Sequence, residues 1–172
     1  MPETESSIPA FLRPLIVVAI GAVIGLLVAE VAFRVAGMDW PVVDMYLRDE
    51  QVGNVLRPNA EFEWTKEGHA FVKINSRGLR DDEHQIPKPD GTWRFAVLGD
   101  SMAEALQVDP EDTFWSEMER GLGDCPALVG MEVEAVNFGV SGHGTAQELI
   151  TLRTRVWDYE PDMVVLAITN GN

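Results

Sequence analysis

The chain has 172 residues, enough for one domain and an anchor but with little room for a second domain. Its 28 Asp and Glu residues against 13 Lys and Arg give a formal net charge of −15. Because phosphate binding requires a basic surface, this balance argues against nucleic acid as a partner. The single cysteine, Cys125, excludes thiolate metal sites and internal disulfides, and the three histidines lack metal-ligand spacing, so we expect neither a metal nor a cofactor.

After a short N-terminal tail, residues 1–13, comes the predicted anchor, residues 14–34, whose residues 14–33 are apolar except for Glu30. About 20 apolar residues span the hydrocarbon core of a bilayer, so the segment predicts an uncleaved, single-pass membrane anchor. A cleaved signal peptide and a buried core helix are the alternatives. The acidic start, with Glu3 and Glu5, disfavours the signal peptide, and the uniform apolar composition disfavours the core helix.

The sequence says little about topology or assembly of this anchor. One arginine flanks each end, so the positive-inside rule does not indicate which end lies in the cytoplasm. Gly21 and Gly25 form a GxxxG pair, which lets helices pack closely but arises often by chance in such a span. The oligomeric state therefore stays open.

Residues 35–92 predict a small β-rich lead-in that ends in a linker. Residues 60–64 alternate apolar and acidic side chains, which is the pattern of a half-buried strand. Residues 70–74 can return as a second strand after a turn. The Pro- and Gly-containing residues 86–91 have the composition of a linker.

From Trp93 onward, apolar strands alternate with helices. Short apolar runs predict strands at residues 93–98, 133–138 and 163–168. The first intervening helix is expected to begin at Asp109 and Pro110, as N-cap and first helical residue. A capping box of Thr145 and Glu148 is expected to open the second. This order predicts a parallel α/β sheet, in which the loops after all three strands meet at one edge.

Those three loops carry Ser101, Gly142 and Asn172. A serine just after a strand can act as a nucleophile, and it needs donors aimed at the developing oxyanion. The backbone N–H groups of Ser101 and Gly142 and the amide of Asn172 can together supply three such donors. Glycine at position 142 lets the backbone approach a substrate without a Cβ. The pattern therefore indicates ester hydrolysis.

Three motifs resemble blocks of the SGNH/GDSL hydrolase family, each after its own strand. The sequence FAVLGDS at 95–101 is similar to block I, NFGVSG at 137–142 to block II, and NGN at 170–172 to the start of block III. Residues 72–80 also resemble segments that precede this domain in membrane-anchored bacterial members. The resemblance implies Ser101 as nucleophile and Gly142 and Asn172 as oxyanion donors.

The resemblance further implies that residues 93–172 are the first βαβαβ half of a flavodoxin-like, three-layer SGNH sandwich, incomplete at its C-terminus. The family's D-x-x-H block, which supplies the catalytic Asp and His, has no counterpart in the sequence, so the chain by itself is expected to be inactive. Asp100 is expected to orient the block I turn, and Asn137 to bond its own loop. His143 is expected to line the pocket or cap a helix and not to act as the base.

The function expected from the resemblance is deacylation of a cell-envelope glycan or lipid by a domain outside the cytoplasm. Transfer of the acyl group to a polysaccharide hydroxyl is an alternative, because it shares the acyl-enzyme. A catalytically silent glycan-binding protein is another. The glycines of residues 139–144 do not follow the order of a dinucleotide-binding loop, so that interpretation is disfavoured.

Overall fold

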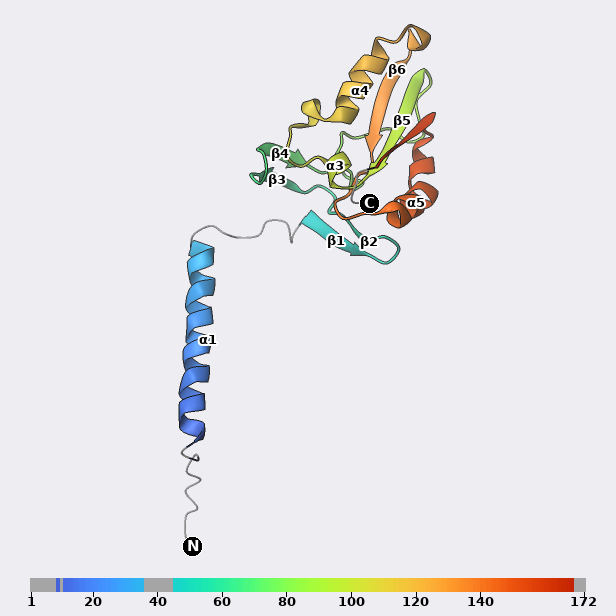
Figure 1. The fold of residues 1–172 in the computed structure, drawn as a ribbon. Helices are drawn as coiled ribbons and strands as arrows, with labels where there is room; N and C mark the ends of the chain where they lie inside the picture. Colours follow the sequence, from blue (N-terminus) through green and yellow to red (C-terminus); the bar gives the residue numbers. More distant parts are fainter. Residues whose placement is uncertain (1–8, 10, 36–44, 169–172) are drawn as a thin grey trace. The chain divides into compact units, whose positions relative to one another are not determined.

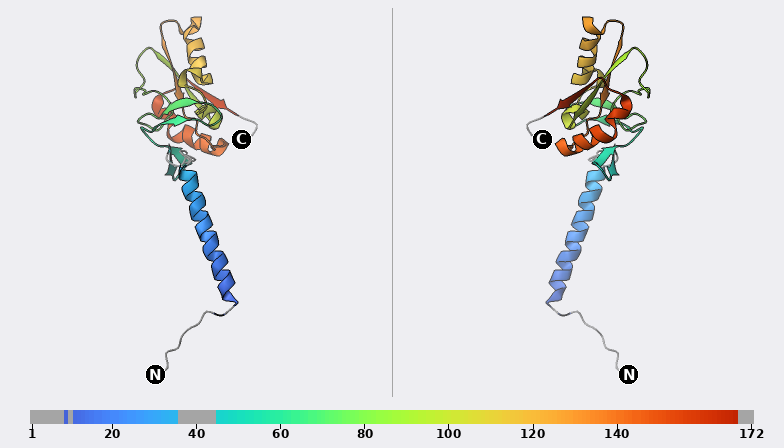
Figure 2. Two further views of the ribbon diagram at one scale, coloured as in Figure 1. Left: turned by 90° about the vertical axis from the view of Figure 1, so that its left-hand side faces the viewer. Right: turned by 90° about the vertical axis from the view of Figure 1, so that its right-hand side faces the viewer.

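The structure is a computed structural model that describes residue 9, residues 11–35 and residues 45–168 (Figures 1 and 2). The chain divides into two compact units, Met1–Pro41 and Val42–Asn172. The residues predicted as a lead-in from 45 onward and those predicted as the main domain fall in the same unit. The linker at 86–91 is therefore a connection inside one compact body.

The predicted anchor is the helix α1, Leu12–Val35. Its most apolar window has a mean hydropathy of 2.7, and none of that window is buried within the protein. Such a helix is long and apolar enough to cross a membrane, although an N-terminal signal sequence has the same properties. Glu30 pairs with Arg34 one turn later, with 2.7 Å between the charged atoms, near the end of the helix.

The three strands predicted after Trp93 form one parallel sheet in the order β6-β5-β7 (Figure 1). Their bounds are Thr92–Gly99 for β5, Glu132–Asn137 for β6 and Met163–Ala167 for β7. The central strand β5 is buried on both faces, as its apolar run predicts. The structure thus confirms a mixed α/β fold with a parallel sheet.

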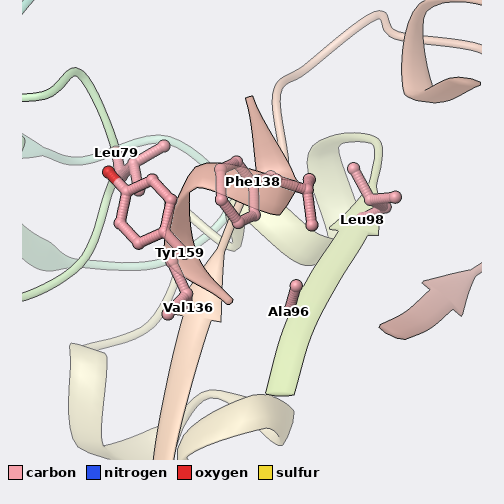
Figure 3. Close-up of a cluster of buried hydrophobic side chains, with 7 residues drawn as sticks. Leu79, Ala96, Leu98, Val136, Phe138 and Tyr159 are labelled. Atoms are coloured by element: carbon pink, nitrogen blue, oxygen red, sulfur yellow. The ribbon is translucent and has the colours of Figure 1, made fainter. Parts of the chain in front are cut away.

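Helices cover both faces of this sheet (Figure 1). On one face, Phe95 and Val97 of β5 pack with Trp115 of α4, Phe114–Gly123. The other face lies beneath α5, Thr145–Thr154, and the short helix η3, Val156–Tyr159. The buried cluster on that face is drawn in Figure 3 and comprises Leu79, Ala96, Leu98, Val136, Phe138, Val156 and Tyr159. Successive side chains of β5 therefore pack alternately into the two cores on opposite faces of the sheet.

The helix start predicted at Asp109 is wrong by four residues. Asp109 makes no side-chain cap, and Pro110 instead opens a short 3-10 helix, η1, which ends at Asp112. Thr113 caps α4, because its hydroxyl oxygen accepts the N–H of Ser116 at 3.3 Å. Proline's fixed φ suits the tighter turn as well as an α-helix, so the sequence signal did not separate the two.

The predicted capping box of Thr145 and Glu148 is also wrong. The N-cap of α5 is Gly144, whose N–H donates to the Gln147 side chain at 3.2 Å. In a capping box, the side chain of the third helical residue reaches back to the N-cap. With Gly144 as the N-cap, that residue is Gln147, and Glu148 is one position too far along the helix. It is buried instead.

The lead-in consists of two antiparallel hairpins. The predicted one is confirmed as β3, Glu61–Trp64, paired with β4, Ala70–Lys73. The other, β1, Tyr46–Asp49, paired with β2, Gly53–Leu56, was not predicted. Its turn is held by the Asp49 carboxylate, which accepts the N–H groups of the second and third residues after it. Without an Asn-Gly or Asp-Gly pair, that turn gave no strong sequence signal.

Both hairpins pack on the loops that follow β5 and β6. Their buried core includes Leu106, which comes after β5, and Val140, which comes after β6. The lead-in residues in this core are Met45, Leu56, Val72 and Ile74. The lead-in is therefore part of the structure that positions the carboxyl edge of the sheet.

Gly139 supplies a test of this packing. It passes α3, Ser101–Glu104, so closely that a Cβ on it would lie 2.6 Å from the backbone carbon of Ala103. We expect Gly139→Ala to lower the free energy of unfolding by about 3 kcal/mol, because the backbone must shift. Urea titrations followed by tryptophan fluorescence in detergent measure the change.

Gly121→Ala is the matched control for that substitution. Gly121 lies in α4, and a Cβ there meets no atom within 4 Å. This variant should gain about 0.5 kcal/mol, since alanine favours helix. Equal stabilities of the two variants would contradict the close approach of Gly139 to α3.

Candidate functional site

Ser101 lies at the carboxyl end of β5, in a tight turn from strand to helix. Asp100 is the N-cap of α3, and its Oδ1 accepts the N–H of Met102 at 2.9 Å. Ser101 is the first residue of this helix and is half-buried. At Gly99, a Cβ would lie 2.8 Å from the Cβ of Ala103, so the helix folds back directly onto the strand. The turn holds Ser101 at the edge of the sheet.

The loop that contains Gly142 runs alongside the end of β5. The N–H of Phe138 donates to the Val97 carbonyl at 2.8 Å, and the N–H of Val140 to the Gly99 carbonyl at 3.2 Å. Parallel pairing thus continues beyond β6, up to the residue that precedes the Asp100 cap. The structure thereby brings the loops of Ser101 and Gly142 to the same edge, as parallel topology requires.

Asn137 fastens this loop to the helix of Ser101. Its side chain is fully buried, and its Oδ1 accepts the N–H of Gly139 at 2.9 Å. Its Nδ2 donates to the carbonyls of Ala103, at 3.0 Å, and Arg80, at 3.3 Å. With both ends of the amide occupied, Asn137 contributes by holding the two loops in register.

Gly142 has a left-handed backbone and is exposed. Its φ is +80°, a conformation that favours glycine, and the space that a Cβ would occupy is open. Within the part of the chain that the structure describes, neither Gly142 nor Ser101 has an acceptor for its backbone N–H. Both groups are therefore available as donors. Asn172, the third expected donor, lies outside the described residues.

A buried carboxylate, Glu104, joins three segments at the site. It lies on α3 with no exposed surface, and it accepts both the N–H of Ser141, at 2.7 Å, and the Ser141 hydroxyl. The hydroxyl of Tyr46 on β1 donates to the same carboxylate at 2.9 Å. Burial raises the pKa of Glu104, and these donors oppose that rise. One side chain thus ties the helix that begins at Ser101 to the loop that contains Gly142 and to the lead-in.

Arg80 supports the far end of the same helix. Its guanidinium is buried and donates to the backbone carbonyls of Glu104, at 2.8 Å, Ala105, at 2.7 Å, and Val108. The last carbonyls of a helix have no partner within it, so these bonds satisfy groups that would otherwise be unpaired. The positive charge also offsets the buried Glu104 carboxylate. Sequence reasoning missed Tyr46, Arg80 and Glu104, because charged side chains near a turn are usually exposed.

His143 contacts the lead-in through its Nε2, which lies 3.0 Å from the carbonyl oxygen of Asn54. Because a carbonyl can only accept, Nε2 carries a proton and Nδ1 is the acceptor of the neutral ring. Burial lowers the pKa of His143, which keeps it neutral. A ring in this tautomer cannot take a serine proton through Nε2.

The other two histidines are held by carboxylates. His84 lies 3.3 Å from Asp81 and 3.7 Å from Glu134. Burial alone would lower the pKa of His84, but the adjacent Asp81 carboxylate outweighs it and raises the pKa overall. His69 lies on the surface, 2.7 Å from Glu63. Each histidine of the chain therefore has a partner other than Ser101.

Glu148 is a second buried carboxylate close enough to Asp100, which precedes Ser101, to feel its charge. It lies on α5, and neither of its oxygens has a hydrogen-bond partner among the described residues. Burial raises the pKa of Glu148, and the charge of Asp100 raises it further. As for metals, the described residues contain no group of three or more His, Cys, Asp or Glu side chains placed to hold one.

No model of a known protein family matches the chain, and no curated protein matches it either. The geometry around Ser101 and the sequence motifs are therefore the observations that bear on function. The geometry supplies a placed serine, two free backbone donors and a buried scaffold. These features are typical of a site that stabilises an oxyanion.

Glu104 gives a prediction about stability. We expect Glu104→Ala to lower the free energy of unfolding by about 3 kcal/mol, because it leaves buried donors of Ser141 and Tyr46 unpaired. Glu104→Gln keeps an acceptor and should cost less. Urea titration of each variant measures the loss.

The pH dependence of the free energy of unfolding separates the effect of the Glu104 charge from that of its packing. Because the folded pKa of Glu104 is raised, its contribution is greatest below its ordinary value of 4.5 and declines as pH rises through the folded value. Glu104→Gln removes this term, so its stability relative to wild type should increase as the pH rises above the ordinary glutamate pKa of 4.5. A difference that stays constant with pH would contradict a raised pKa.

Proposed function

We propose that the chain carries the nucleophile and oxyanion half of a serine ester hydrolase, which acts through an acyl-enzyme on Ser101. The observation that carries the proposal is the juxtaposition of the Ser101 and Gly142 loops. Asn137 and Glu104 hold these loops together from below, and the N–H groups of both residues lack acceptors in the described chain. Preorganised donors of this kind stabilise charge that develops in the transition state.

In the reaction, the Ser101 oxygen attacks the ester carbonyl carbon while a base takes the hydroxyl proton. The carbonyl π electrons move to oxygen, which accepts hydrogen bonds from the N–H groups of Ser101 and Gly142. Asn172 adds its side-chain amide, as the family resemblance implies. Collapse restores the carbonyl and expels an alkoxide, which takes the proton from the base. Water, whose proton the base takes, then attacks the acyl carbon. Collapse breaks the bond between that carbon and the Ser101 oxygen, releases the carboxylic acid, and returns the proton from the base to Ser101.

The general base of this mechanism comes from outside the residues described. His69, His84 and His143 have other partners, and Nε2 of His143 already carries a proton. The SGNH/GDSL resemblance implies a histidine in a downstream D-x-x-H block. We therefore expect no appreciable ester turnover from the 172-residue chain alone.

The substrate and location follow from the anchor and the resemblance. α1 is apolar enough to hold the site at a membrane. As the resemblance to membrane-anchored bacterial members implies, we propose that the site lies outside the cytoplasm. The substrate class is then an acyl ester on an envelope glycan or lipid. Replacement of water by a sugar hydroxyl in the last step would make the protein an O-acyltransferase through the same acyl-enzyme.

Fluorophosphonate labelling of a protein that contains this chain together with the D-x-x-H block implied by the resemblance tests the nucleophile. We expect covalent labelling that Ser101→Ala abolishes, because only an activated serine attacks phosphorus at a useful rate. Ser116→Ala on α4 is the matched control and should label as wild type. Equal labelling of the Ser101→Ala and wild-type proteins would refute the assignment.

The role of His143 has a separate test. Glutamine can keep a donor toward the Asn54 carbonyl but cannot act as a base at neutral pH. We expect His143→Gln to label with the fluorophosphonate within about threefold of the wild-type rate, since removing a general base costs about 100-fold or more. A loss of that larger size would show that His143 is the base.

A further inference from the structure

A hollow of about 180 Å³ borders the candidate oxyanion loop. Val140 and His143, which lie on either side of Gly142 in the sequence, both line it. Its remaining walls come from β2, from the turn at 77–79, and from α5 and η3. The hollow thus shares a loop with the proposed site but is lined by none of its catalytic groups.

The inner wall of the hollow is apolar and partly aromatic. Tyr159 and Phe138 meet edge to face, with ring centroids 5.2 Å apart, and Leu79 lies beside them (Figure 3). Burial raises the pKa of Tyr159, so its hydroxyl stays protonated. A wall of this kind can stack against the apolar face of a sugar ring. A single sugar ring is also about the size of the hollow.

The rim of the hollow carries charged groups with unused hydrogen-bonding capacity. Arg77 is exposed, and its guanidinium makes no hydrogen bond or ion pair with the described residues. Its position is fixed by the turn, because the buried Asn75 accepts the N–H groups of Arg77, at 3.0 Å, and Leu79, at 2.9 Å. At Gly78, a Cβ would lie 2.9 Å from the Leu56 carbonyl, so the turn sits tightly on β2.

The lining also contains a charged donor and a charged acceptor on and beside η3. Arg155 is held by Asp49, with 2.7 Å between the charged atoms, and Asp158 follows three residues later. The hollow is therefore close to electrically neutral, because the two arginines, Arg77 and Arg155, are balanced by the two aspartates, Asp49 and Asp158. Sugar hydroxyls both donate and accept, so they suit mixed Arg and Asp groups. A fatty acyl chain would instead have to desolvate these charges without compensation.

We propose that this hollow binds one monosaccharide ring of an acylated glycan. The substrate class of the proposed site is then a glycan and not a lipid. This assignment rests on the proposed function for the bond that is cleaved, whereas binding of the ring does not require Ser101. The ring would be held beside Gly142, which places an ester on a neighbouring hydroxyl near the oxyanion donors.

Saturation-transfer NMR on the whole chain in a sugar-free detergent tests binding directly. The probes are the methyl glycosides of glucose, galactose, mannose and N-acetylglucosamine, with ethyl butyrate as the acyl probe. We expect transfer to the ring protons of at least one glycoside. Arg77→Ala and Asp158→Ala should each weaken its binding by about tenfold or more, because a charged hydrogen bond is lost.

Arg153→Ala is the matched control, since Arg153 is exposed on α5 and does not line the hollow. It removes the same charge as Arg77→Ala and should leave binding unchanged. Absence of glycoside binding that depends on Arg77 would overturn the proposal. Arg77-dependent binding of ethyl butyrate in place of the sugars would overturn it as well.

The two proposals fail in different ways. Ser101→Ala should keep glycoside binding, because Ser101 does not line the hollow. Binding without fluorophosphonate labelling would overturn the hydrolase and leave the monosaccharide subsite standing as that of a glycan-binding protein. Labelling without Arg77-dependent binding would overturn the subsite alone.

Discussion

The Glu104 carboxylate is the interaction on which the arrangement of the site depends. It receives hydrogen bonds from Ser141, next to Gly142, and from Tyr46 on the first strand, while its own helix begins at Ser101. A buried carboxylate is costly unless it is fully hydrogen-bonded. Separating α3 from the Ser141 loop or from β1 would leave the Glu104 carboxylate without hydrogen-bond partners, so the three segments stay together. Arg80 completes this scaffold by occupying the carbonyls at the end of α3.

This network gives the lead-in a role in the proposed chemistry. Tyr46 joins the carboxylate network, Asn54 holds His143, and Val72 packs in the core that contains Val140. The segment that follows the apolar helix therefore forms the floor beneath both loops. It also supplies one wall of the hollow in which we place a sugar ring. The lead-in and the sheet act as one body, and the site would not be complete without either.

The sequence predicted the sheet well because its signal is local and strong. Each strand is an apolar run ended by glycine or a polar residue, and parallel topology then places Ser101 and Gly142 at one edge. Helix starts were predicted less well. Thr113 and Gly144 cap the helices in place of Asp109 and Thr145, because several residues in a row can cap and only packing selects one.

The apolar helix, the order of strands and helices, and the edge at which Ser101 lies can all be predicted from the amino-acid sequence. Period and composition encode these features within a few residues. The buried partners of Glu104, the proton on His143 and the hollow lined by Arg77 and Tyr159 became visible when the chain was folded. Such features depend on contacts between residues 37 to 89 positions apart in the sequence, or on which atom of a hydrogen bond carries the proton. A pattern of neighbouring residues contains neither kind of information.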